Sequence, residues 1–162
     1  SALSKTGYVS NNLKKAEPTK AMLAAKLSKG DFLISRSNTA ELVGLVGIFV
    51  ENRDDVSFPD TMMRLHIDSE KVRNEYMEIL LLSARGRRHM QMVCAGTSSS
   101  MKKINRKTLG SFIVHYPELS LQDKLIDDVK EFTHSYKKAD NSVTKSSGAM
   151  HALSNYYLGG AK

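Results

Sequence analysis

Basic side chains gather in one stretch of this chain that has no acidic residue. Residues 79–117 contain seven lysines and arginines and no aspartate or glutamate. Residues 1–78 carry eleven charges of each sign and residues 118–162 carry six of each, so this one stretch accounts for the formal net charge of +7. Its basic residues are Arg85, Arg87, Arg88, Lys102, Lys103, Arg106 and Lys107. A localised positive patch on an otherwise balanced protein favours a polyanionic partner.

The chemistry that these residue types offer is the recognition of nucleic acid. Lysine and arginine neutralise phosphates and release counterions, which supplies most of the sequence-independent affinity. Hydroxyl and amide side chains bond to the backbone, while arginine–guanine and asparagine–adenine or glutamine–adenine pairs read the sequence. The predicted contact residues are Arg36, Ser37, Asn38, Arg85, Arg87, Arg88, Gln91, Thr97, Ser98, Ser99, Lys102, Lys103 and Asn105. The alternative interpretation is a solvated basic face. Few aromatic residues interleave with the charges, which disfavours single-strand stacking.

No catalytic constellation is visible in the sequence. Cys94 lies in an apolar run, where a lone cysteine is typical of a small core residue. The acid and lysine at Asp68 and Lys71 do not have the spacing of a nuclease metal site, and no glycine-rich phosphate loop occurs. The histidines have no metal-ligand spacing among themselves or with Cys94; they are His66, His89, His115, His134 and His151. We therefore expect a non-catalytic protein without cofactor or metal, and a nuclease is the least favoured reading.

Length and composition predict one domain, with at most an appendage. The chain has 162 residues, of which 41% are hydrophobic and 25% charged, as in a soluble globular protein. Apolar runs such as residues 45–50 are too short to span a membrane, and residues 1–30 do not resemble a signal peptide. A single cysteine excludes an internal disulfide and fits the cytoplasm. Because the chain starts with Ser-Ala-Leu, we expect it to be processed or cut from a longer protein.

Short elements are expected to position the basic stretch. Helix formers predict a short helix over 19–27, and apolar or alternating runs predict strands over 32–34, 42–50 and 62–67. An apolar pattern predicts a helix over 74–85, interrupted by Gly86 and resumed over 87–93 with Met90 and Val93 facing inward. Residues 112–114 are predicted to form a strand that ends at Pro117.

A long amphipathic helix is predicted for the end of the chain. Ser120 and Asp123 have the form of a capping box, and the pattern extends towards residue 157 with a weakened middle in 141–148. An apolar stripe recurs at steps of three or four residues; it is Leu121, Leu125, Val129, Phe132 and Tyr136. We expect this stripe to pack on a partner helix. A protein–protein assembly module that works through this helix, without direct DNA reading, is therefore the alternative function.

Motifs spread along the chain resemble the specificity subunit of type I restriction–modification enzymes, in particular one target recognition domain followed by its helix. Residues 27–36 look like the family's Gly-Asp strand entry, residues 42–50 like its glycine-containing strand, and residues 75–81 like its Tyr-hydrophobic helix. The most recognisable stretch is Gly96-Thr97, Ile104-Asn105 and Leu109, then Tyr116-Pro117 and Leu121-Gln122. Together these motifs cover residues 3–135. The family's domain starts earlier, and a full subunit has two such domains, each followed by a helix.

The resemblance implies an α+β protein with a small mixed or antiparallel sheet, short helices and a long C-terminal helix. Residues 1–117 would be a target recognition domain whose N-terminal part is missing, and residues 118–158 a spacer or dimerisation helix. Such a domain reads one half of a split double-stranded DNA target. Its partners would be methyltransferase (modification) subunits, a restriction subunit, and a second recognition domain or second copy through the helix.

Overall fold

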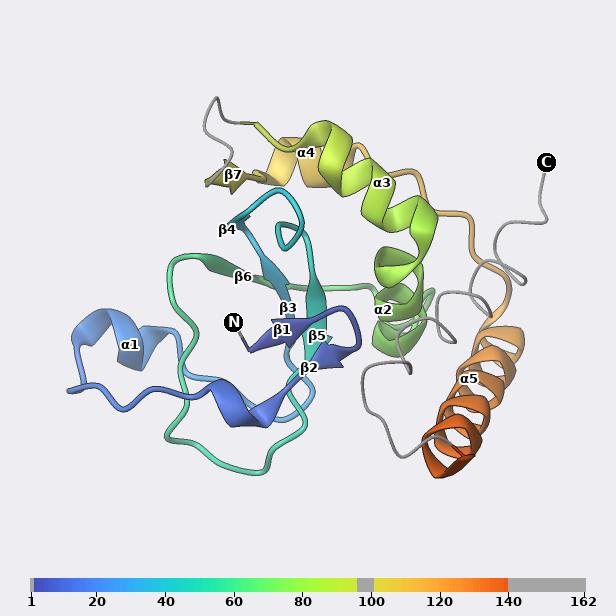
Figure 1. The fold of residues 1–162 in the computed structure, drawn as a ribbon, viewed down its shortest axis with the longest axis horizontal. Coiled ribbons are helices and arrows are strands. Elements are labelled where there is room, and N and C mark those ends of the chain that lie inside the picture. Colours follow the sequence, from blue (N-terminus) through green and yellow to red (C-terminus); the bar gives the residue numbers. More distant parts are fainter. Residues whose placement is uncertain (1, 96–100, 140–162) are drawn as a thin grey trace.

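A three-stranded antiparallel sheet lies at the centre of the protein (Figure 1). Strand β3 (Phe32–Ser35) lies between β5 (Val46–Ile48) and β6 (Met62–Leu65). All of β3 is buried, whereas β6 is half-buried, as its alternating sequence predicts. A hairpin of β1 (Leu3–Ser4) and β2 (Gly7–Tyr8) packs beside β5. The computed structural model describes residues 2–95 and 101–139, and its architecture confirms the predicted α+β class.

The apolar run over residues 42–50 forms only a short strand. Its first half is a turn in which the amides of Leu42 and Val43 both donate to the carbonyl of Thr39. Gly44 has φ +74, a conformation that side chains disfavour, and a Cβ there would lie 2.7 Å from Met90. The apolar run therefore predicts burial correctly, but the predicted strand is too long, because residues of the turn also contribute to the core.

Ser83 forms a corner between two helices. Helix α2 (Asn74–Leu82) ends there, and the Ser83 hydroxyl donates to Leu80 and accepts from the Gly86 amide, which caps α3 (Ala84–Val93). A Cβ on Gly86 would lie 2.3 Å from the Leu80 carbonyl oxygen, so only glycine fits against the end of α2. The predicted break at Gly86 is thus wrong by three residues: the chain turns at Ser83, and the glycine permits the close approach.

The predicted strand over 112–114 is also wrong. After α4 (Arg106–Gly110), residues 112–118 run extended over the two helices without joining a sheet. The carbonyl oxygens of Ile113 and His115 accept from the side chains of Arg85 and Tyr76. The β-prone composition of this segment matches its packing against helices rather than a place in a sheet.

The C-terminal helix α5 (Leu119–Ala139) belongs to the same hydrophobic core as the sheet. Leu125, Ile126 and Val129 are buried, and α5 packs against α2. Two of the five residues of the stripe predicted to face a partner, Leu125 and Val129, are therefore covered within this chain. Leu121 and Phe132 remain 51% and 40% exposed at the edge of that face, and the Phe132 ring stacks on that of Tyr136.

Gln122 fastens the start of α5 to the chain before α2. Its fully buried amide accepts from the Arg73 amide at 2.9 Å and donates to the carbonyls of Lys71 and Pro117 at 2.8 and 2.7 Å. The Arg73 guanidinium also forms an ion pair with Asp123 at 2.9 Å. The predicted capping box is wrong, because the helix starts at Leu119 and the Ser120 hydroxyl bonds to the Glu118 carboxylate instead.

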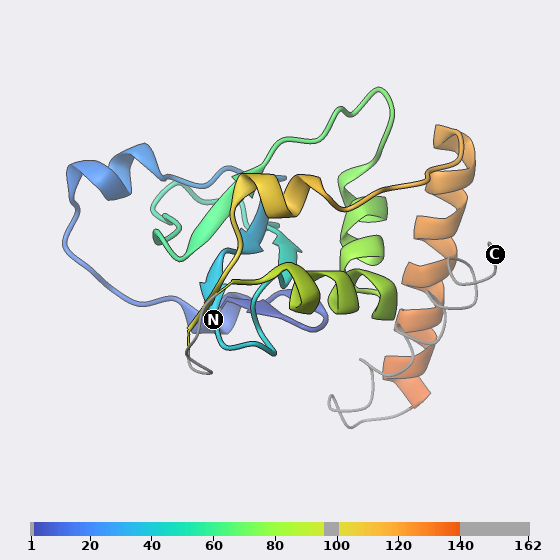
Figure 2. The ribbon, with the colours of Figure 1, turned by 90° about the horizontal axis from the view of Figure 1, so that it is seen from above.

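Two small elements complete the described part. A 3-10 turn, η1 (Ser10–Asn12), and the helix α1 (Lys20–Ala24) lie between β2 and β3, and the Thr19 hydroxyl caps α1. Seen from above, α1 and α5 lie at opposite ends of the long axis (Figure 2). The prolongation of the last helix through residues 141–157 falls outside the described residues.

Candidate nucleic-acid interface

The fold brings together two predicted contact segments that are far apart in sequence. Strand β4 (Ser37–Asn38) pairs antiparallel with β7 (Lys102–Lys103), with Ser37 opposite Lys103 and Asn38 opposite Lys102. Ile104 extends the junction by donating its amide to the carbonyl of Arg36. The Arg36 side chain is exposed beside this β4–β7 ribbon. Basic and amide groups of both segments thus occupy one small ribbon.

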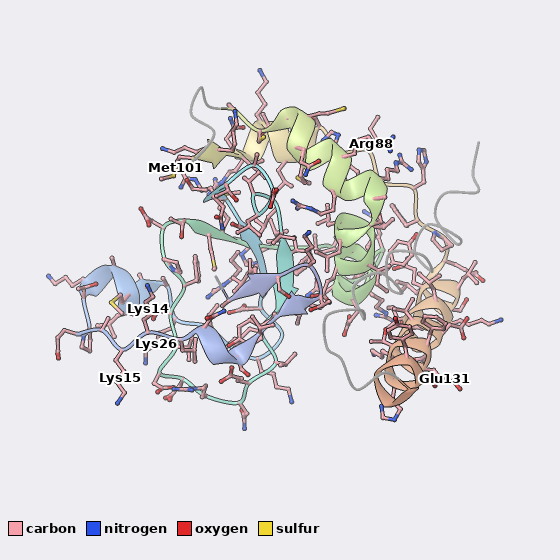
Figure 3. All side chains as sticks on the ribbon, in the orientation of Figure 1. Lys14, Lys15, Lys26, Arg88, Met101 and Glu131 are labelled. Atoms are coloured by element: carbon pink, nitrogen blue, oxygen red, sulfur yellow. The ribbon has the colours of Figure 1, made fainter. Side chains whose placement is uncertain are left out.

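Helices α3 and α4 continue the basic surface from this ribbon. Figure 1 shows β4, β7, α3 and α4 along the same edge of the molecule, and α3 contacts α4. Arg88 projects from the outer side of α3 at this edge (Figure 3). Arg85, Gln91, Arg106 and Lys107 are exposed on the same two helices. We call the β4–β7 ribbon, α3 and α4 together the basic edge.

An open groove lies on the basic edge between α3 and residues 111–113. It presents two arginines and a histidine above apolar side chains; its lining is Ala84, Arg85, Arg88, His89, Met92, Ser111, Phe112 and Ile113. The His89 ring packs at 5.0 Å from the Phe112 ring and lies 3.3 Å from the Ser111 hydroxyl. The cationic rim of this groove suits an anionic group such as a phosphate, which a guanidinium holds through paired hydrogen bonds.

Arg87 is a correction to the predicted contact set. Its guanidinium turns inward and donates to the carbonyls of Glu41 and Val43, both at 2.9 Å, while its second amino nitrogen is buried. Burial lowers the pKa of this arginine from its ordinary value. Arg87 therefore fastens α3 onto the turn before β5. The sequence does contain a signal for this orientation: Arg87 lies three residues before the buried Met90, so both side chains are on the same face of α3.

Several of the predicted polar contacts already have partners inside the protein. The Asn105 side chain accepts from the Thr108 amide and forms a capping box for α4. Asn38 bonds to Ser35 and Thr39, and the Ser37 hydroxyl lies 3.1 Å from the Met101 sulfur. These side chains hold the basic edge in shape. The predicted contacts Thr97, Ser98 and Ser99 lie outside the described residues.

The arginines of α3 differ from basic residues elsewhere in whether they form ion pairs. Among the described residues, the ion pairs engage Arg53, Arg64, Lys71 and Arg73, all outside residues 79–117. Arg85 and Arg88 have no acidic partner in this part of the chain. Their charge is therefore available to a ligand. The two basic residues of α4, Arg106 and Lys107, were left out of the predicted set although they belong to the same acid-free stretch.

The described residues do not provide a metal centre. No group of three or more histidine, cysteine or acidic side chains converges in residues 2–95 and 101–139. Helices in the same ranges lack the combination of length and apolarity that a membrane crossing needs. The described arrangement is suited to holding an anion.

The class of protein to which this chain is similar is the specificity subunit of type I restriction enzymes. The relative is the type I restriction enzyme EcoKI specificity subunit of Escherichia coli (strain K12), which is 28% identical over 132 residues. The match covers 80% of this chain and 27% of that subunit, so the chain spans about a quarter of the relative's length. No protein-family model matches the chain. The similarity supports the relationship that the motifs in residues 3–135 predict.

Proposed function

We propose that this chain reads double-stranded DNA as one target recognition domain of a type I restriction–modification specificity subunit. The observation that carries the proposal is the pairing of β4 with β7, which joins two candidate contact segments on the same edge as Arg85 and Arg88 of α3. Phosphates would bind Arg85, Arg88 and Lys103, while Arg36 and Gln91 would face base edges. The similarity to a specificity subunit supports the same conclusion independently.

The rest of the assignment follows from that relationship. We propose that residues 1–117 form the recognition domain and that residues 118–158 form a spacer helix. The spacer would meet methyltransferase subunits and a second recognition domain or second copy. A restriction subunit would complete the assembly in the cytoplasm, and the chain itself would be non-catalytic and bind no cofactor. The exposed Leu121 and Phe132 at the edge of α5 supply an apolar surface for such a partner.

Charge reversal on α3 tests the proposal. The double variant R85E/R88E is compared with K124E/K130E, which makes the same change of charge on exposed positions of α5. At about 0.1 M salt, each lost phosphate contact weakens binding by about tenfold and lowers the salt slope by about 0.9. Fluorescence anisotropy on duplex DNA should therefore show a loss of about 100-fold for the α3 variant alone. Equal affinity of both variants would contradict the assignment of the basic edge.

The alternative function is an assembly module without direct DNA reading. The exposed apolar edge of α5, with its stacked Phe132 and Tyr136 rings, favours it. Sedimentation at several concentrations separates the two functions. A concentration-dependent dimer that L121S/F132S abolishes, together with no DNA binding by the wild type, would favour the assembly module.

A further inference from the structure

A second basic surface lies away from the basic edge. Residues 13–29, which we call the lysine arm, include α1 and extend from the side of the sheet opposite α5 (Figures 1 and 2). No residue of α1 is buried. Figure 3 shows Lys14, Lys15 and Lys26 projecting from this arm. The arm therefore presents its side chains to solvent and contributes little to the core.

The excess of lysine in this part of the chain does not appear when charges are counted over residues 1–78 as a whole. Residues 1–30 contain six lysines and one acid, Glu17, whereas residues 31–78 contain five basic residues and ten acids. The two excesses cancel, so residues 1–78 look neutral as a whole. All six lysines are exposed. They are Lys5, Lys14, Lys15, Lys20, Lys26 and Lys29.

The arm is held in place at its base. The Leu27 amide donates to the Val56 carbonyl at 2.8 Å, and the Phe58 amide donates to the Ala25 carbonyl at 3.1 Å. The Ser57 hydroxyl donates to the carbonyl of Met22 at 2.7 Å. The buried side chain of Leu27 joins the core beside these bonds. These bonds anchor residues 22–27, so α1 and its Lys20 are held on the sheet side of the arm, which reduces the entropy lost when Lys20 holds a ligand.

The lysines of the arm differ in whether an acidic side chain acts on them. Asp55 has a pKa lowered first by Arg53 and also by Lys26, so Lys26 already acts on an acid of the protein. Within the described residues, Lys14, Lys15 and Lys20 form no ion pair.

The residue type indicates the kind of ligand. Lysine is a flexible point charge that binds a phosphate without the planar geometry that arginine uses to read guanine. Exposed lysines before, on and after the five-residue helix α1, of which only Lys20 belongs to the helix, therefore suit a repeating polyanion. Leu13 and Leu23 are exposed on the arm, but so short a helix lacks the apolar face that anchors a helix in a membrane surface.

We propose that Lys14, Lys15 and Lys20 bind the phosphate backbone of duplex DNA and supply sequence-independent affinity in addition to that of the basic edge. This inference rests on the proposed function, since it assigns a second contact to the same DNA. The arm and the basic edge then have separate tasks. The arm adds affinity equally for every sequence, and the basic edge discriminates among sequences.

The test compares the full-length chain carrying K14E/K15E with the control K124E/K130E. Affinity for duplex DNA is measured at several salt concentrations on two unrelated sequences. The arm variant should lose about 100-fold in affinity on both sequences, and its salt slope should fall by about 1.8 for two lost contacts. The ratio of affinities between the two sequences should stay at the wild-type value.

Three outcomes would overturn the inference. An arm variant that matches the control, while R85E/R88E loses binding, removes the arm and leaves the proposed function intact. Loss of binding to vesicles of anionic phospholipid, with DNA affinity unchanged, assigns the arm to a lipid surface. A wild-type chain that binds no duplex DNA removes the arm's role and the proposed function together. Loss of DNA affinity in the arm variant with none in R85E/R88E would support the arm and refute the basic edge.

Discussion

A partly buried carboxylate should make the stability of this protein depend on pH. Glu78 lies on α2 among the β1–β2 hairpin and β5, where its carboxylate accepts from the Ile48 amide at 3.3 Å and faces Gly7. Burial raises its pKa from 4.5 to about 7, the Ile48 amide opposes the rise and Glu75 adds to it. The proton is therefore bound more tightly in the folded state than in the unfolded state.

The sign and size of the effect follow from linkage. The stabilisation is complete below about pH 4.5 and is lost as the pH rises to about 7, because the unfolded chain releases this proton first. A pKa difference of this size corresponds to about 3 kcal/mol, at about 1.4 kcal/mol per tenfold in proton affinity. E78Q keeps an uncharged acceptor for the Ile48 amide at every pH. It should therefore abolish this loss and be more stable than the wild type at pH 8.

Urea unfolding at pH 5 and pH 8 measures the difference. The wild type should lose up to about 3 kcal/mol of unfolding free energy across this range relative to E78Q. E131Q, at an exposed position of α5, should retain the wild-type dependence (Figure 3). If E78Q and the wild type lost the same amount between the two pH values, the burial argument for Glu78 would be refuted.

Three further comparisons of variants test the fold and the site. G86A should lower the stability measured by thermal unfolding by about 2 kcal/mol or more, because the added Cβ would overlap a carbonyl of α2. The control G110A should change the stability little, because a Cβ there meets no atom within 4 Å. Q122A should lower the free energy of unfolding by about 2–4 kcal/mol, because it leaves buried backbone groups without hydrogen-bond partners. Hydrogen exchange should then show faster opening of α5, and unchanged exchange would contradict the fastening role of Gln122. R87A should lower the melting temperature, whereas R88A should weaken DNA binding at constant stability, and the reverse result would contradict their orientations.

Local patterns were sufficient for the elements whose burial follows from a short repeat. The buried strand β3, the half-buried strand β6 and the helix α2 lie where their apolar patterns predict them. The predicted ends of helices and strands were less accurate where a contact with another element determines where the element ends. The chain leaves α2 at Ser83 because that side chain bonds both helices, and residues 112–118 stay out of a sheet because they lie on helices.

The candidate site shows the same division between composition and contact. Neighbouring arginines with identical charge, Arg87 and Arg88, take opposite roles because consecutive helix positions are rotated by about 100°. One guanidinium bonds to carbonyls of the turn before β5, and the other faces the groove. A count of charges does not distinguish Arg87 from Arg88; only their positions on the helix relative to the buried Met90 do.

The sequence by itself determined that positive charge is concentrated in residues 79–117, that the chain alternates short strands and helices, and that an amphipathic helix follows. These are properties of neighbouring residues, so they need no knowledge of the fold. Tertiary structure alone decided that β4 lies against β7, that Gln122 holds α5, and that Leu125 and Val129 are buried in the core of this chain. The reason is physical: burial and hydrogen bonding between distant segments depend on which surfaces the whole chain brings into contact.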